Sequence, residues 1–368
     1  MTVAQVHVRK DKLSETALVE VPSGELAEGA IRLKVESFSV TANNITYAVV
    51  GDGFGYWNFF PPKTEEEGPE HSWGIVPMWG HAVVTQSKHD EFAVGERVYG
   101  YLPMGTELDV VPGNVSAASF MDTTDYRQPM SPVYNSYNRL AGDPEHDPSR
   151  ENERMIYGPL FKTGFVIDYF LRSEDWFGAS QVILTSASSK TAMGLASVAK
   201  QNSPNVKRIG LTSAGNVDFV EKTGLYDEVA TYETIGTLPI ADTVTVDFAG
   251  NAEVLGKLHH HFSDTLKYSC LVGATHVEAR SSIGGDAGDL PGPKPTLFFA
   301  PDHFVSFFKE HGPQEGGKMI AANWHAFLSA VEGTVEIETH GGLEAARETY
   351  LAMLNGDIDP ARGVVIQP

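Results

Sequence analysis

The sequence predicts an α/β protein with two joined domains, a β domain followed by a doubly wound parallel sheet. Its 368 residues exceed what one compact domain usually needs. The first third consists of short alternating or β-branched runs separated by Gly, Pro and Asp turns, which is typical of a barrel-like β domain. From Gln181 onward, short apolar runs alternate with helical patterns, which indicates a parallel sheet with helices on its faces.

Composition narrows the class of partner. The formal net charge of -21 opposes binding to nucleic acid and to anionic lipid, so we expect a small-molecule substrate and neither of those partners. The sequence has no apolar leader and no apolar stretch of bilayer length, which predicts a cytoplasmic protein. Its single cysteine, Cys270, excludes an intrachain disulfide and any multi-thiolate metal site. Cys270 lies in an apolar run and is expected to be a buried residue without a functional role.

Residues 1–155 are expected to form the β domain. Within it, the segment of about residues 122–154 is rich in Pro, Asn, Asp, Ser and Tyr, which predicts an inserted, solvated loop. A cap over a substrate site is an alternative interpretation of the same segment. Residues 156–295 are expected to form the parallel-sheet domain.

The turn after the first strand of the parallel sheet opens a helix, at the place where dinucleotide folds bind pyrophosphate. The usual G-x-G-x-x-G is absent, and Ala187, Ser188 and Ser189 occupy the turn. Their small size admits a phosphate, and the hydroxyl groups of this segment, including Thr191, together with the Lys190 ammonium, are possible donors. The alternative is a Ser-rich helix cap. The glycines of an ATP-binding Walker loop are missing.

The next strand ends where an NAD-binding fold places Asp or Glu against the ribose hydroxyl. Thr212, Ser213 and Asn216 stand there instead. An acidic group would repel a 2′-phosphate, whereas hydroxyl and amide groups bind it, so the sequence favours NADP over NAD. Lys190 and Lys222 are possible charge partners. The alternative is an ordinary turn before a helix.

Three segments resemble the medium-chain dehydrogenase/reductase superfamily, in particular its zinc-free quinone and enoyl reductases. They are PMWGHAVV, VGERVYG and NNITYAVVGDGFGY. The resemblance implies a GroES-like β-barrel domain joined to a Rossmann domain, with residues 296–368 returning to the first domain. Ala82 replaces the Glu of the superfamily's G-H-E motif, and the glycine fingerprint is lost, which indicates a divergent subfamily.

Zinc-dependent members of the superfamily bind metal through cysteines and the histidine of that motif. The single cysteine of this chain cannot supply the cysteine ligands of such a zinc site, so no metal is expected. His81 matches the motif histidine and is interpreted as a hydrogen-bonded core or turn residue. His259, His260 and His261 are consecutive on a predicted helix and are interpreted as surface residues.

The resemblance implies that Tyr47 is the general acid, with Asn44 near the position of its polar partner, and that Tyr56 is a second candidate. The alternative is a tyrosine whose hydroxyl is simply satisfied at a domain edge. Nearby aromatic residues form either an apolar substrate cleft or core, and these are Tyr56, Trp57, Phe59, Phe60, Trp73 and Trp79.

The expected cofactor contacts come from the strand ends of the second domain and the turns after them. They are Ser186, Ser188, Ser189, Lys190, Thr191, Thr212, Ser213, Asn216, Tyr232, Gly250, Gly273, Thr275 and Phe299. The resemblance also implies a homodimer formed by edge strands, to which residues 266–275 are expected to contribute.

These expectations combine into one functional hypothesis: a zinc-independent, NADP(H)-dependent oxidoreductase acting on a small carbonyl, quinone or enoyl compound. Two alternatives remain open at this point. One is a cofactor-independent lyase or hydrolase, and the other is a nucleotide sensor without turnover, because a shared fold does not fix a function.

Overall fold

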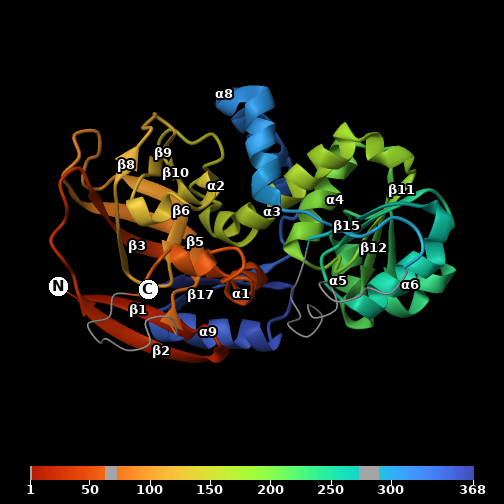
Figure 1. Ribbon diagram of the computed structural model, residues 1–368, viewed down its shortest axis with the longest axis horizontal. Helices are drawn as coiled ribbons and strands as arrows, with labels where there is room; N and C mark the ends of the chain where they lie inside the picture. Colours follow the sequence, from red (N-terminus) through yellow and green to blue (C-terminus); the bar gives the residue numbers. More distant parts are fainter. Residues whose placement is uncertain (1, 63–72, 273–289) are drawn as a thin grey trace. The chain divides into compact units, whose positions relative to one another are not determined.

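The structure is a computed structural model that describes residues 2–62, 73–272 and 290–368. The chain forms two compact units (Figure 1). The β unit comprises Met1–Ile156 and Glu336–Pro368, and the parallel-sheet unit comprises Tyr157–Val335.

The β unit is built mainly from strands. Its strands are β1 (Thr2–Arg9), β2 (Lys12–Pro22), β3 (Ile31–Val40), β4 (Trp73–Gly74), β5 (Pro77–Ser87), β6 (Arg97–Pro103), β7 (Glu107–Val110), β8 (Pro112–Gly113), β9 (Ser119–Asp122), β10 (Ser136–Arg139), β17 (Glu336–Gly341) and β18 (Arg362–Gln367). Its helices are α1 (Ala42–Val49), η1 (Tyr56–Asn58), η2 (Asp125–Arg127), α2 (Pro132–Asn135) and α9 (Leu343–Asn355). Helix α3 (Glu151–Ser173) begins in this unit and continues into the next.

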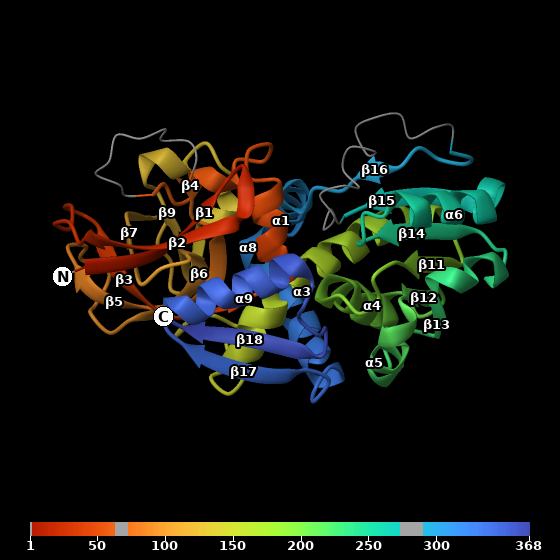
Figure 2. The same cartoon turned by 90° about the horizontal axis from the view of Figure 1, so that it is seen from below.

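The strands of the β unit form two sheets around one apolar core. The smaller sheet has the order β2-β1-β4, and the larger has the order β17-β18-β3-β5-β6-β10-β9-β8 with β7 also paired to β3. Strand β18 joins β3 antiparallel and β17 parallel, so the C-terminal segment completes a sheet begun near the N-terminus. Figures 1 and 2 show the blue helix α9 beside the red strands β1 and β2.

The prediction of a solvated loop over residues 122–154 is wrong. The segment contains α2 and strand β10, and β10 pairs with both β6 and β9. Several of its polar side chains are buried, and they bond one another. Arg127 and Asp122 form an ion pair at 2.9 Å with both side chains fully inaccessible to solvent, and Asp143 pairs with the buried Arg154.

The parallel-sheet unit alternates strands and helices as the sequence predicts. Its strand order is β13-β12-β11-β14-β15-β16, and every recorded pairing in it is parallel (Figure 2). The strands are β11 (Gln181–Leu184), β12 (Lys207–Thr212), β13 (Glu228–Thr231), β14 (Thr243–Asp247), β15 (Leu266–Leu271) and β16 (Thr296–Leu297). The helices are η3 (Asp175–Gly178), α4 (Lys190–Asn202), η4 (Ala214–Asn216), α5 (Val217–Lys222), η5 (Tyr232–Thr237), α6 (Ala252–Phe262), η6 (Ser263–Thr265) and α8 (Ala300–Ala330).

Helices α3 and α4 cross closely because glycine stands on both. A Cβ on Gly164 would lie 2.4 Å from the backbone nitrogen of Leu195, and one on Gly194 would lie 2.9 Å from the Cα of Phe161. Both contacts are with backbone, so a side chain at either position would push the helices apart. This close crossing fixes α4, whose N-terminus follows the first strand of the sheet.

The return to the β unit occurs at Glu336, later than residue 296 where the sequence analysis placed it. The residues after 296 first add strand β16 to the parallel sheet and then form α8. Because β16 pairs outside β15, the run 266–271 is not an edge of the described sheet. Among the described residues, no helix combines the length and the apolar character needed to cross a membrane.

Candidate functional site

The turn between β11 and α4 contains one residue in a backbone conformation that favours glycine. Ser186 has a φ of 47°, in the left-handed region that favours glycine. Its amide donates to the hydroxyl of Tyr232 at 3.0 Å, which holds the turn in place. The Oγ of Ser189 accepts from the amide of Ala192 at 3.2 Å, so Ser189 caps α4 as the alternative interpretation of this loop predicts.

The turns after β11 and β12 are linked through side chains. The side-chain amide of Asn216 donates to the Oγ of Ser188 at 3.3 Å. Thr212 is buried at the end of β12, and Ser213 directly after it is exposed. The parallel pairing of β11 and β12 places these turns at the same edge of the sheet. This is the position at which parallel sheets of this kind bind a nucleotide.

A third turn, after β14, is organised by a buried carboxylate. Asp247 accepts from the hydroxyl of Thr185 at 2.6 Å and from the amides of Ala249 and Gly250 at 3.1 Å each. The same Thr185 oxygen accepts from the amide of Phe248 at 2.9 Å. Burial raises the pKa of Asp247. Sequence reasoning missed Thr185 and Asp247, although both stand at the carboxyl ends of neighbouring strands.

The remaining predicted cofactor residues are distributed around the same unit. Lys190 and Thr191 begin α4, Gly250 has a φ of 65° in the turn after β14, and Phe299 immediately precedes α8. Gly273 and Thr275 lie outside the described residues.

A cluster of aromatic side chains lies in the β unit around Tyr47 of α1. Its rings are in mutual contact, with centroids 4.5–6.2 Å apart for the nearest pairs. We call it the tyrosine cluster, and its members are Tyr47, Tyr56, Phe59, Trp79, Tyr101 and Tyr134. Tyr134 comes from the segment that was predicted to be a solvated loop. Neither it nor Tyr101 was found by sequence reasoning.

The hydroxyl of Tyr47 is held by two donors, and neither of them is Asn44. The side-chain amide of Asn43 donates to it at 2.6 Å and the indole Nε1 of Trp79 donates at 3.0 Å. Asn44 instead donates to the carbonyl of Pro77 and accepts from the amide of Thr41, which fixes the start of α1.

The other hydroxyl groups of the cluster are held differently. The hydroxyls of Tyr56 and Tyr134 share a hydrogen bond of 2.7 Å. The hydroxyl of Tyr101 is buried and interacts with that of Tyr47. Burial raises the pKa of Tyr47, Tyr56, Tyr101 and Tyr134 above that of a free tyrosine, so all four stay neutral at physiological pH.

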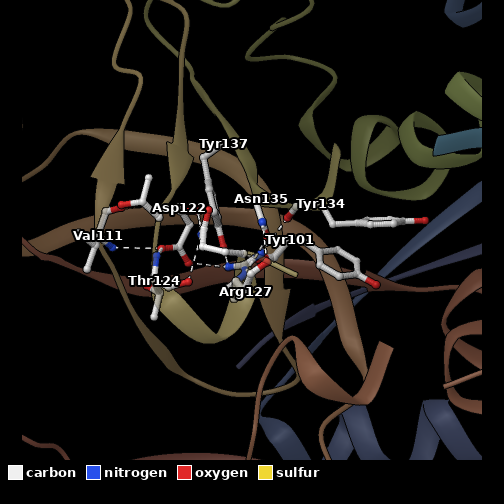
Figure 3. Close-up of polar contacts among 10 residues, drawn as sticks. Tyr101, Val111, Asp122, Thr124, Arg127, Tyr134, Asn135 and Tyr137 are labelled. Atoms are coloured by element: carbon white, nitrogen blue, oxygen red, sulfur yellow. Dashed lines mark hydrogen bonds and ion pairs between the residues drawn. The ribbon is translucent and has the colours of Figure 1, made fainter. Parts of the chain in front are cut away.

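The buried guanidinium of Arg127 holds the backbone behind two of these tyrosines (Figure 3). It donates to the carbonyl of Tyr134 at 2.8 Å and to the hydroxyl of Tyr137 at 2.9 Å. Tyr137 in turn donates to the carbonyl of Tyr101 at 2.6 Å. The guanidinium also donates to Asp122 at 2.9 Å and to Asn135 at 3.0 Å. Arg127 is therefore a positioning residue for the cluster.

His81 is buried on β5, as expected, but the expected hydrogen bonds are not there. Its ring is inaccessible to solvent, and neither ring nitrogen has a hydrogen-bond partner among the described residues. Burial lowers the pKa of His81 to about 3. The side chain is consequently neutral across the physiological range.

This burial makes stability depend on pH. Between the unfolded pKa of about 6.5 and the folded value of about 3, the unfolded chain binds the extra proton, so the free energy of unfolding falls as the pH is lowered. From pH 7 to pH 5.5, we expect the wild type to lose about 1 kcal/mol more than His81→Phe. Urea titrations of both proteins at the two pH values measure this. Equal losses would contradict the assignment of a neutral His81.

The interpretation of His259 as a surface residue is wrong. It is fully buried, and its ring nitrogens bond the carbonyl of Pro291 and the hydroxyl of Ser269, each at 2.9 Å. It follows Leu255 by four positions on α6, which places it on the apolar face of that helix. Within the described ranges, no group of three or more His, Cys, Asp or Glu side chains is arranged to hold a metal ion.

Comparison with solved structures shows the fold. The chain matches CurA from Vibrio vulnificus in complex with NADPH at 14% identity, covering 99% of this chain and 98% of that one, with a TM-score of 0.60. It matches a quinone oxidoreductase from Coxiella burnetii at 12% identity over 100% of both chains, with a TM-score of 0.55. The yhdH oxidoreductase from Salmonella enterica in complex with NADP matches at 13% identity over 100% of this chain and 99% of that one, with a TM-score of 0.53.

These similarities confirm the predicted fold of a GroES-like β domain joined to a Rossmann domain. No curated protein matches the sequence. A family model described as "Protein of unknown function (DUF2855)" matches residues 38–359.

Proposed function

Because this chain belongs to the DUF2855 family and has the fold of NADP(H)-bound reductases, we propose that it is a zinc-independent, NADP(H)-dependent oxidoreductase. Its substrate is a small carbonyl, quinone or enoyl compound. One observation carries the proposal: the turn after β11 keeps the left-handed conformation at Ser186 although no glycine is present. A left-handed residue in this turn is the backbone feature that glycine usually supplies where the chain approaches a pyrophosphate.

The residues present fit NADP. The N-terminus of α4 presents a partial positive charge to the pyrophosphate, with Ser188 beside it. We assign Thr212, Ser213 and Asn216 as the hydroxyl and amide contacts of the 2′-phosphate. When bound, NADPH supplies a hydride. The tyrosine cluster supplies neutral hydroxyl groups and an apolar surface for the substrate. The homodimer and the cytoplasmic location expected from the sequence stay predictions.

A single charge at Ser213 tests the cofactor assignment. We expect Ser213→Asp to weaken NADPH binding by tenfold or more, about 1.4 kcal/mol, because the carboxylate repels the 2′-phosphate. Binding of NADH, which lacks that phosphate, changes little. Ser213→Asn is the matched control, since it has the same shape without the charge. Calorimetric titration of the three proteins with both nucleotides gives the affinities.

Turnover is tested separately, by following NADPH absorbance with quinones, enones and simple ketones. Oxidation of NADPH by one of these classes supports the proposal. Tight NADPH binding without turnover of any of them would favour a nucleotide sensor. Absence of NADPH binding would remove the oxidoreductase proposal.

A further inference from the structure

The turn after β11 contains a strained residue. Ser186 has a φ of 47°. A residue with a Cβ atom is disfavoured in this left-handed region, whereas glycine enters it freely. The conformation of Ser186 therefore depends on contacts that hold it there.

Two tyrosines supply such contacts, and each bonds the main chain of the turn. The hydroxyl of Tyr232 accepts from the amide of Ser186 at 3.0 Å. The hydroxyl of Tyr226 donates to the carbonyl of Ala187 at 2.8 Å. One bond lies before the φ and ψ rotations of Ser186 and the other lies after them. Together the two bonds oppose a change in the backbone conformation of Ser186.

Both tyrosines come from the ends of one nearby strand. Tyr226 precedes β13 and Tyr232 directly follows it. Strand β13 pairs with β12, which in turn pairs with β11, and Figure 2 shows these three strands side by side. All of the residues involved belong to the parallel-sheet unit. The two contacts thus connect the turn to the second strand away from it, within one unit.

Gly210 of β12 permits the contact between Tyr226 and Ala187. A Cβ on Gly210 would lie 2.9 Å from the Cβ of Ala187 and 2.9 Å from the Cδ1 of Tyr226. A side chain there would push both residues away. The amide of Ala187 also donates to the carbonyl of Leu211 at 2.9 Å. Ala187 is therefore fixed through both its amide and its carbonyl, and the glycine that permits this stands in β12 rather than in the turn.

We propose that Tyr232 and Tyr226 are positioning residues for the cofactor, which replace a turn glycine by holding Ser186 in the left-handed conformation. The inference rests on the proposed function, because the pyrophosphate of NADP is assigned to this turn and to α4. Both tyrosines act through the backbone of the turn. The part of the ligand that senses this geometry is the 5′-diphosphate, so a nucleotide without a 5′-phosphate makes no contact there.

A double-mutant cycle between Tyr232 and Ser186 tests the inference. We expect Tyr232→Phe to weaken NADPH binding about tenfold, because Ser186 loses a bond that holds it in a disfavoured conformation. Glycine enters that conformation freely, so the same substitution should weaken binding less than about threefold in the Ser186→Gly background. Tyr226→Phe should show the same dependence on residue 186. Calorimetric titration with NADPH gives the affinities.

Two controls separate positioning from general stability. Tyr169→Phe removes a hydroxyl group of the same unit that bonds Glu310 and His311, and its NADPH affinity should equal that of the wild type. Adenosine 2′-phosphate has no 5′-phosphate, so its binding should be unchanged in Tyr232→Phe. A general loosening of the unit would instead weaken the binding of both nucleotides.

Amide hydrogen exchange without nucleotide tests the contact itself. The amides of the turn should exchange faster in Tyr232→Phe than in the wild type. Faster exchange with an unchanged NADPH affinity would overturn the inference and leave the proposed function standing. An equal loss of affinity in the wild-type and Ser186→Gly backgrounds would do the same. If the wild type does not bind NADPH, the proposed function fails together with this inference.

Discussion

Replacing Arg127 by methionine is expected to lower the free energy of unfolding by about 3–5 kcal/mol. The substitution keeps most of the length of the side chain but removes the charge that pairs with Asp122. That carboxylate is fully buried, so it would be left without its cation. The guanidinium also contacts aromatic faces, with its central carbon 5.2 Å from the ring centroid of Phe60. Urea unfolding followed by tryptophan fluorescence measures the loss.

A matched control shows that burial causes the effect. Arg9 pairs with Asp11 at 2.7 Å on the surface, so Arg9→Met should cost less than about 1 kcal/mol. Arg127→Met should also disorder the carbonyl contacts of Tyr134 and, through Tyr137, of Tyr101. Equal, small losses of stability in the two variants would contradict the structural role of Arg127.

Removal of the Thr185 hydroxyl is expected to have the second large effect. Thr185→Val keeps the shape of the side chain, but Asp247 loses its shortest hydrogen bond and the amide of Phe248 loses its acceptor. Leaving these buried groups unsatisfied should cost about 2–3 kcal/mol of stability. The turn that contains Gly250 would also loosen, so NADPH affinity should fall. Thermal and urea unfolding, with nucleotide titration, measure the two effects.

Two further measurements isolate the hydroxyl group. Thr185→Ser retains it and should recover most of the stability and the affinity. Loss of the donor raises the pKa of Asp247 further above its unfolded value, so the folded chain binds the proton more readily. The deficit of Thr185→Val should then be larger at pH 8 than at pH 5. A deficit that does not depend on pH would contradict an ionised Asp247 in the wild type.

The fold was largely predictable from periodicity. Short apolar runs separated by helical patterns identify β11, α4 and β12, because a parallel strand is buried on both faces. The segment 122–154 was not predictable from composition. Polar residues normally mark solvated loops, but Arg127, Asp122 and Asn135 are buried by bonding one another, and a single sequence does not show which polar groups become partners.

The parts of the candidate site that lie next to a predicted strand or helix in the sequence were predictable. The turn at Ser186 was placed because it directly follows a strand and opens a helix. Tyr101 and Tyr134 were missed because they join Tyr47 only through the pairing of β5, β6 and β10. A signal was available at Tyr99 and Tyr101, whose spacing places both aromatic rings on one face of a strand. No comparable pattern marked Tyr134.

Strand β18 has a consequence for the order in which the protein is made. It lies between β17 and β3, so the sheet of the β unit draws on both early and late parts of the chain. When synthesis has reached Val335, the parallel-sheet unit has all its residues, whereas the β unit still lacks β17, α9 and β18. Until then the end of β3 from Phe38 to Val40, which β18 will pair, presents an unpaired edge to other nascent chains. The unit that comes second in the sequence is thus the first whose synthesis is finished.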